Sequence, residues 1–107
     1  MKELIWIGTS KHDLRSFPAD VRQDAGYQLS KVQHGDDPDD WKPMSGIGLG
    51  VREIRIRDQA GAFRVIYLAR FRNAVYVLHA FQKKTQETPV KDIQLARTRF
   101  RTLRGYS

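Results

Sequence analysis

The sequence predicts an α+β fold, in which an antiparallel β-meander is flanked by an N-terminal edge strand, an N-terminal helical hairpin and a C-terminal helix. Three observations lead to this prediction. Strand-like segments follow one another with short connections, a helical apolar stripe precedes them, and another follows them. The expected order is β-α-α-β-β-β-α. A chain of 107 residues has room for one hydrophobic core, so a single domain is expected over residues 1–107.

The meander is predicted from three neighbouring segments. Phe63–Arg70 and Ala74–Phe81 are rich in β-branched and aromatic residues, and Arg72–Asn73 between them has turn character. Both segments are apolar on both faces, which is typical of strands near the middle of a sheet that is covered on two sides. Val51–Arg57 alternates strictly between apolar and charged residues, so we expect it to form the preceding strand.

The first part of the chain reads as a strand and a helical hairpin. Glu3–Gly8 is the predicted edge strand. The stripe that follows has three- and four-residue spacing, and Phe17–Pro18 divides it, because the residue before a proline disfavours helical geometry. The stripe consists of Leu14, Phe17, Val21, Ala25, Leu29 and Val32.

Gly35–Gly50 is predicted to be a flexible loop. It holds an acidic run, Asp36–Asp40, and ends in a glycine-rich stretch that lacks the preceding strand and following helix of a phosphate-binding loop. We expect Trp41 and Met44 to hold this loop against the body. After the meander, Thr88–Pro89 has the cap-then-proline pattern that begins a last helix, whose apolar stripe runs from Val90 to Leu103.

The composition favours a polyanionic partner. With 19 Lys+Arg against 12 Asp+Glu, the formal net charge is +7, which suits nucleic acid, an acidic membrane surface or an acidic protein segment, or else serves solubility alone. There are no cysteines, hence no disulfide framework or thiolate site, in keeping with a reducing cytoplasm. The apolar start, Leu4–Ile7, is too short for a signal peptide or a membrane span, so a soluble cytoplasmic protein is expected.

The residue types argue against several catalytic classes. The three histidines, His12, His34 and His79, have no metal-ligand spacing, and Asp36–Asp40 lacks the pattern of a calcium loop. We therefore expect no metal and no other cofactor. No nucleophile elbow is present, and the acidic residues do not suggest a paired-carboxylate hydrolase.

Metal-free cleavage of RNA remains compatible with the residues. Such an enzyme needs cations around a phosphate and groups that move protons near neutral pH. We take Arg64, His79, Lys83 and Lys84 as catalytic candidates, and as RNA-binding candidates Arg55, Arg57, Arg97, Arg99 and Arg101.

Each candidate also has an ordinary structural interpretation. His79 would be a satisfied core histidine, and Arg64 would pair with Glu53 across the sheet. The two lysines and the helix arginines would be solvated surface, or would bind phosphates without specificity.

Three segments resemble the phage-derived, HigB-like branch of the RelE/ParE toxin superfamily. They are GVREIR from Gly50, FRVIY from Phe63 and LHAFQKKTQETP from Leu78. The resemblance implies a RelE-like fold and a toxin of a type II toxin–antitoxin pair. It further implies a metal-independent endoribonuclease that inhibits translation by cutting messenger RNA, usually in the ribosomal A site, and a helix-turn-helix antitoxin as partner.

The resemblance also bears on single residues. Arg64 matches the strand arginine that stabilises the cleaved phosphate, and His79, Lys83 and Lys84 lie where the family carries its other catalytic and RNA-contacting groups. Phe81 stands where related toxins often have a tyrosine and has no hydroxyl to offer a proton, which shifts the role of acid or base toward His79 or a lysine. Two alternatives stay open: a ParE-like toxin that binds DNA gyrase without chemistry, and an inactive RNA-binding relic.

Overall fold

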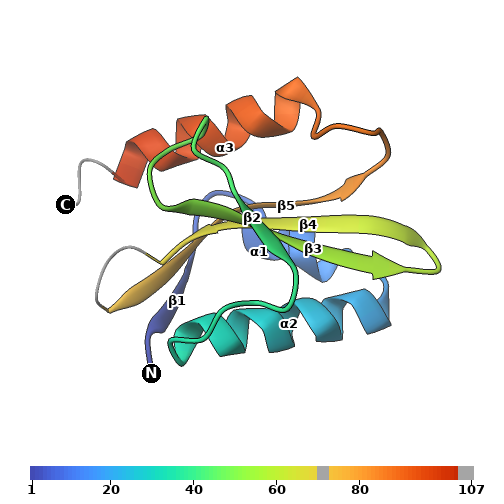
Figure 1. The fold of residues 1–107 in the computed structure, drawn as a ribbon, viewed down its shortest axis with the longest axis horizontal. Helices are drawn as coiled ribbons and strands as arrows, with labels where there is room; N and C mark the ends of the chain where they lie inside the picture. The colour runs from blue at the N-terminus through green and yellow to red at the C-terminus, as the bar shows by residue number, and fades with distance from the viewer. Residues whose placement is uncertain (70–72, 104–107) are drawn as a thin grey trace.

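The computed structural model describes residues 1–69 and 73–103, and it has the predicted α+β architecture (Figure 1). A five-stranded mixed sheet has the order β1-β5-β4-β3-β2, with helices on both of its faces. In chain order the elements are β1 (Glu3–Trp6), α1 (Ser10–Arg15), α2 (Ala19–Gln33), β2 (Trp41–Pro43), β3 (Val51–Asp58), β4 (Gly61–Leu68), β5 (Ala74–Lys83) and α3 (Val90–Leu103).

The predicted meander and edge strand are confirmed. β3 pairs with β4, and β4 with β5, both antiparallel. β1 joins the outer edge of β5 in parallel, with Glu3 opposite Ala74 and Trp6 opposite Val77. β4 lies at the centre of the sheet, which explains why its residues are apolar on both faces. The predicted end of the strand at Arg70 and the first residue of the predicted turn, Arg72, lie outside the described residues.

The segment predicted as a flexible loop contains a further strand. β2 pairs antiparallel with β3, with Trp41 opposite Ile54. The guanidinium of Arg52 lies 3.8 Å from the centroid of the Trp41 ring, and Asp39 exchanges hydrogen bonds with Gln28 of α2. These contacts fix the segment against its neighbours. A three-residue strand that ends in a proline is too short to show a two-residue period in the sequence.

A β-bulge interrupts β5 near its middle. Ile66 of β4 is opposite His79, whereas the next residue, Tyr67, is opposite Val77, so Leu78 has no counterpart in β4. Both Leu78 and His79 consequently turn toward α3: Leu78 packs in the core on that face, and His79 bonds to Asp92 of the helix.

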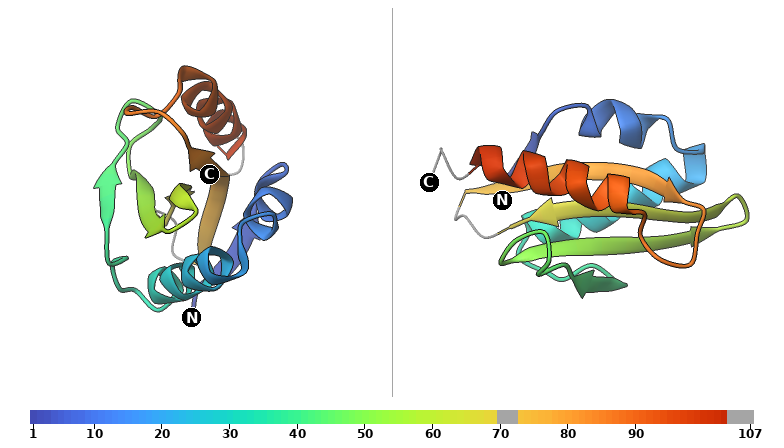
Figure 2. Two further views of the ribbon diagram at one scale, coloured as in Figure 1. Left: turned by 90° about the vertical axis from the view of Figure 1, so that its right-hand side faces the viewer. Right: turned by 90° about the horizontal axis from the view of Figure 1, so that it is seen from above.

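The sheet separates two hydrophobic cores (Figure 2). α1 and α2 cover one face, and the whole predicted stripe from Leu14 to Val32 is buried there against residues such as Val65 and Tyr67. α3 covers the other face through Ala96 and Leu103, which pack on Ile66, Leu78 and their neighbours. Within residues 1–69 and 73–103, no helix has the length and apolar character that crossing a bilayer requires.

Candidate functional site

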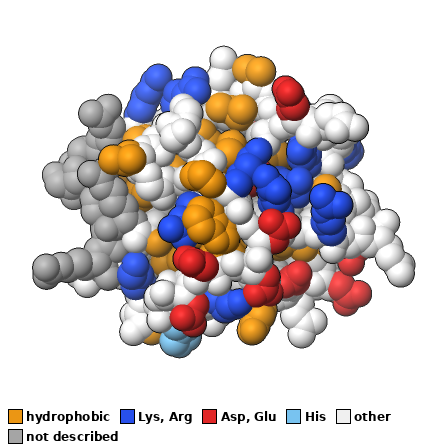
Figure 3. Space-filling view, in the orientation of Figure 1, with side chains coloured by type: hydrophobic (Ala, Val, Ile, Leu, Met, Phe, Trp, Pro, Cys, Tyr) orange, Lys and Arg blue, Asp and Glu red, His pale blue; other side chains and the backbone are white. Residues whose placement is uncertain are grey.

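Cations from three strands line one hollow at the end of the sheet. The hollow measures about 720 Å³ and lies where the β3–β4 hairpin meets the end of β5. We call it the cation hollow and define it by Arg57, Arg64, Lys83 and Lys84; the acidic Asp58 lines it as well, so the basic residues outnumber the acidic one. Figure 3 shows Lys and Arg side chains gathered below α3 on the right-hand half of the face toward the viewer. Three of the four catalytic candidates thus line one space.

The strand register brings these charges together. Arg55 is opposite Arg64 across β3 and β4, and Ala62 is opposite both Arg57 and Lys83 in the two neighbouring strands. Like charges in cross-strand contact are unfavourable unless an anion compensates them. A compensating carboxylate is therefore required at this end of the sheet.

Glu53 supplies that carboxylate and is completely buried. Its Oε1 lies 3.4 Å from Nε of Arg64 and 3.9 Å from Nζ of Lys42, and its Oε2 accepts a hydrogen bond of 3.0 Å from Oγ1 of Thr88. The pairing of Arg64 with Glu53, considered from the sequence as the ordinary interpretation, is thus present. It coexists with the position of Arg64 in the cation hollow.

Arg64 is only 5% exposed, at the base of the hollow. Its Nη1 donates a hydrogen bond of 3.0 Å to the carbonyl of Phe63, while Nη2 has no hydrogen bond to any described residue. Burial, and then the charges of Arg55 and Arg57, lowers the pKa of Arg64, and Glu53 partly offsets this effect. An arginine pKa starts so far above neutrality that the group stays charged. Arg64 can therefore offer an N–H to a phosphate oxygen.

Lys83 is half-buried at the side of the hollow. Partial removal from water, followed by the positive charge of Arg64, lowers the pKa of Lys83. Lys42 and Arg55 act in the same direction, and Glu53 opposes them. A lowered pKa increases the neutral fraction of the amine, so Lys83 is suited to accept a proton.

His79 lies apart from the residues that line the cation hollow. It is 5% exposed, its Nε2 is 2.7 Å from Oδ1 of Asp92, and its ring stacks on Phe81 with centroids 5.0 Å apart. Its Nδ1 is buried without a hydrogen-bond partner among the described residues. This placement links β5 to α3, as expected of a core histidine.

The three candidate arginines of α3 have different surroundings. Nη2 of Arg97 donates to the carbonyl of Gly46 at 2.9 Å, and Arg99 donates to the carbonyl of Leu78 at 2.8 Å and to Oγ1 of Thr9 at 2.9 Å. These two side chains hold α3 against the rest of the protein. Arg101 is exposed.

Sequence reasoning missed Lys42, Thr88 and Asp92, and it considered Glu53 only as a partner of Arg64. Thr88 was interpreted as the start of a helix, whereas its hydroxyl binds Glu53. One signal was available: Glu53 alternates in step with Arg55 and Arg57, so all three share one face of β3. Lys42 could not be found, because it lies on the unpredicted strand β2.

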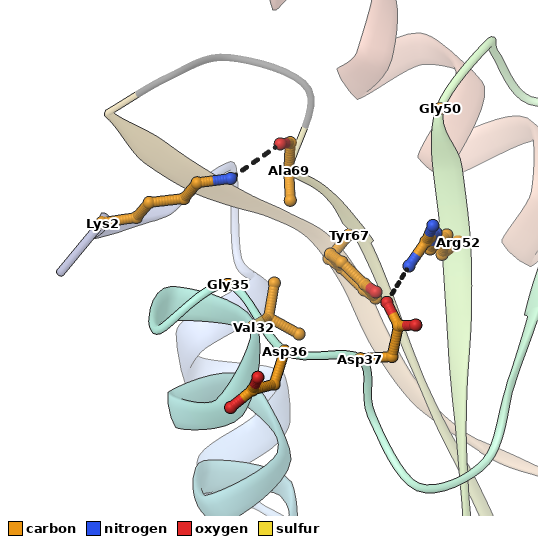
Figure 4. A pocket seen from close by; sticks show the side chains of 9 residues that line it. All are labelled: Lys2, Val32, Gly35, Asp36, Asp37, Gly50, Arg52, Tyr67 and Ala69. Atoms are coloured by element: carbon orange, nitrogen blue, oxygen red, sulfur yellow. Dashed lines mark hydrogen bonds and ion pairs between the residues drawn. The ribbon is translucent and has the colours of Figure 1, made fainter.

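A second pocket, of about 310 Å³, is drawn in Figure 4. Arg52 donates to Asp37 at 2.8 Å, and Nζ of Lys2 donates to the carbonyl of Ala69 at 3.1 Å. Asp36 lines the pocket as well, so its acidic groups match its basic ones. It therefore lacks the excess positive charge that a polyanion needs, and the cation hollow is the stronger candidate.

The cation hollow suits a phosphate group. Its arginines and lysines can neutralise phosphate oxygens, and Lys83 can exchange a proton. In the described ranges, no group of three or more His, Cys, Asp or Glu side chains is arranged to hold a metal ion. The arrangement thus offers charge stabilisation and proton transfer from side chains of the chain itself.

Comparison with known proteins places the chain in a family. The sequence profile described as "Phage derived protein Gp49-like (DUF891)" matches residues 12–101, a range that includes every candidate site residue. The family includes RelE-like toxins of toxin–antitoxin systems, in agreement with the resemblance found in the sequence; the HigB-like assignment stays a prediction. A comparison with curated proteins finds no match. The chain belongs to the phage-derived Gp49-like family.

Proposed function

We propose that the chain is the toxin of a toxin–antitoxin pair and that it cleaves messenger RNA without a metal ion. The observation that carries this proposal is the convergence of Arg57, Arg64, Lys83 and Lys84 on one hollow. A protein that only blocks another protein needs no neutralised, desolvated arginine beside a lysine with a lowered pKa. Membership of a family that includes RelE-like toxins supports the biological role.

The reaction is a transfer within the RNA chain. The 2′-oxygen attacks the neighbouring phosphorus and loses its proton, and the bond from phosphorus to the 5′-oxygen breaks. The products carry a 2′,3′-cyclic phosphate and a 5′-hydroxyl. The protein must accept one proton, stabilise the negative charge that develops on the phosphate, and donate one proton to the leaving oxygen.

The residues of the cation hollow divide these tasks. Nη2 of Arg64 donates to the phosphate oxygens, and Glu53 holds the guanidinium in place beforehand, so little reorganisation is needed during the reaction. Lys83 in its neutral form accepts the proton of the 2′-hydroxyl. Lys84 donates to the 5′-oxygen, and Arg57 binds a phosphate. His79 positions β5 against α3.

Substrate and partner follow from the charge distribution and from the family resemblance. The net charge of +7, with Arg55 and Arg57 on β3 and Arg101 exposed on α3, suits messenger RNA bound on the ribosome. A helix-turn-helix antitoxin is the proposed protein partner, and the basic surface gives it a region to cover. Both assignments extend the resemblance to HigB-like toxins.

The test is to induce the protein in a bacterial host and to map new RNA 5′ ends across the transcriptome. The proposal expects cuts within translated regions, in register with codons. Arg64→Ala should remove them, whereas the matched control Arg22→Ala, on the exposed face of α2, should leave them unchanged. Growth arrest without new ends would favour gyrase binding, and the absence of arrest would favour an inactive relic.

A further inference from the structure

An aromatic-lined pocket of about 300 Å³ lies close to the cation hollow. Its walls come from the junction of α1 with α2 and from the ends of β4 and β5. We call it the aromatic pocket; it is lined by Asp13, Ser16, Phe17, Pro18, Phe63, His79, Ala80, Phe81 and Gln82. His79 positions β5 against α3, and none of the other lining residues has a task in the proposed reaction.

The aromatic pocket and the cation hollow lie back to back at one end of the sheet. In β4, Ala62 and Arg64 line the cation hollow, and Phe63 between them lines the aromatic pocket. In β5, Lys83 likewise lines the cation hollow, and its neighbour Gln82 lines the aromatic pocket. Because neighbouring residues of a strand point to opposite faces, only the ends of β4 and β5 separate the two spaces.

The outer edge of β5 leaves a route between them. β1 ends at Trp6, opposite Val77, whereas β5 continues to Lys83, so no described strand pairs with the outer edge of its last residues. α1 lies beside the first part of this edge, and Oγ of Ser10 donates to the carbonyl of Val77 at 3.0 Å (Figure 2). A full added strand would therefore overlap α1, whereas the space between α1 and the last residues of β5 is left to a compact group.

The walls of the pocket suit a flat ring. The rings of Phe17 and Phe63 pack with centroids 4.9 Å apart, and Phe81 adds a further aromatic wall. Single-stranded nucleic acids are bound by combining a cationic groove for the backbone with aromatic side chains for the bases. The volume is at the lower end for small-molecule pockets, enough for one base.

Asp13 and Gln82 each present a free oxygen, which accepts hydrogen bonds. Oδ2 of Asp13 accepts from Thr9 at 2.8 Å, which leaves Oδ1 free. Nε2 of Gln82 donates to the carbonyl of Ala60 at 3.0 Å, which leaves Oε1 free. The hydroxyl of Ser16 already donates to the carbonyl of Asp13 at 2.6 Å. Acceptors bind the exocyclic amino group of cytosine, adenine or guanine, whereas uracil has a carbonyl oxygen in place of the amino group of cytosine.

We propose that the aromatic pocket binds one base of the RNA whose phosphate lies in the cation hollow, and that it selects bases with an exocyclic amino group. This inference rests on the proposed function, because it requires a phosphate in the cation hollow. The sharpest comparison is cytosine against uracil, since the two have the same size and cytosine has an exocyclic amino group where uracil has a carbonyl oxygen.

The experiment measures the affinity of the purified protein for short fluorescent oligodeoxynucleotides, which have no 2′-hydroxyl and cannot be cleaved. Oligomers of deoxycytidine should bind about tenfold more tightly than oligomers of deoxyuridine or oligomers with abasic sites. Asp13→Asn and Ser16→Leu should bring the cytosine-to-uracil ratio close to one and leave the deoxyuridine affinity unchanged. Asp20→Asn removes the same charge at an exposed position of α2, so it should preserve the cytosine-to-uracil ratio.

The outcomes separate this inference from the proposed function. Equal binding of deoxycytidine and deoxyuridine oligomers would overturn the base pocket and leave phosphate binding intact. A cytosine preference that survives both Asp13→Asn and Ser16→Leu would place base recognition elsewhere and also overturn it. If no oligomer binds and RNA is not cleaved, the proposed function itself fails.

Discussion

Nε of Arg64 lies 3.4 Å from Oε1 of Glu53, and neither atom makes a hydrogen bond to a described residue. Both side chains are buried, so the pair is an electrostatic restraint with little screening by water. Glu53 also lies near Lys42 and accepts a hydrogen bond from Thr88, which precedes α3. One carboxylate thus pairs with the buried arginine of the hollow and connects it to the segment leading into the last helix.

Replacing Glu53 should change the pH dependence of RNA cleavage. Glu53 raises the pKa of Lys83, so Glu53→Gln should lower that pKa further. If neutral Lys83 accepts the proton, activity rises with pH through this pKa, and the rising limb should move to lower pH. Lys42→Ala removes a charge that lowers the pKa of Lys83, so it should move the limb to higher pH.

Opposite shifts in these two variants, measured as single-turnover rates across pH, would identify Lys83 as the titrating group. Identical profiles in both variants and the wild type would contradict that assignment. Glu53→Gln should also lower the free energy of unfolding by about 3 kcal/mol, because buried Arg64 loses its counter-charge. Urea denaturation measures this loss and shows whether each variant is folded at the assay temperature.

His79→Gln tests the structural placement of the histidine. The substitution disturbs the buried bond to Asp92 between β5 and α3, and it should lower the free energy of unfolding by about 1–3 kcal/mol. Because His79 lines the aromatic pocket and not the cation hollow, the folded variant should cleave saturating RNA at close to the wild-type rate. A loss of activity by orders of magnitude with unchanged stability would instead make His79 a catalytic residue.

The arginines of α3 should separate into structural and binding roles. Arg99→Lys loses the hydrogen bonds that the guanidinium makes to the carbonyl of Leu78 and to Oγ1 of Thr9. Its unfolding midpoint should fall, because the free energy of unfolding drops by about 1–2 kcal/mol. Arg101→Gln should leave the unfolding midpoint unchanged. It should reduce the slope of log RNA affinity against log salt concentration by about one. Titrations at several salt concentrations, with thermal melts of both variants, check the two outcomes. A stable Arg99→Lys protein would contradict the structural role.

Gly48 should be required for packing. A Cβ atom at this position would lie 2.4 Å from the ring of Phe100 in α3, so Gly48→Ala should lower the free energy of unfolding by about 1–3 kcal/mol. At Gly46 the same atom meets nothing within 4 Å, which makes Gly46→Ala the matched control. Equal stability of the two variants in urea would show that the loop does not pack as described.

The periodic elements were predictable from the sequence because each has a long apolar pattern. The stripe from Leu14 to Val32 and the apolar strands β4 and β5 were assigned correctly. β2 was not, since its stability comes from contacts of Trp41 with Arg52 and of Asp39 with Gln28, which are distant in sequence or lie in non-periodic segments. The sequence predicts a flexible glycine stretch, whereas Gly48 lies against Phe100, whose ring leaves no room for a Cβ atom.

The candidate site was predictable in residue type but less so in arrangement. Arg64, Lys83 and Lys84 do line one hollow. The placement of His79 depends on the bulge at Leu78, which turns the histidine toward α3, and no local sequence signal marks this bulge. The tertiary contacts of Arg97 and Arg99 likewise depend on where α3 crosses the body, so the sequence alone could not separate them from Arg101.

The central claim is that side chains of the cation hollow cleave RNA through the 2′-hydroxyl. The most direct measurement is to incubate the purified protein with messenger RNA, both free and loaded on translating ribosomes, and to identify the new ends. We expect 2′,3′-cyclic phosphates and 5′-hydroxyls with the wild type, and neither with Arg64→Ala. Ends that carry a 3′-hydroxyl and a 5′-phosphate, or intact RNA in every reaction with folded protein, would contradict the account.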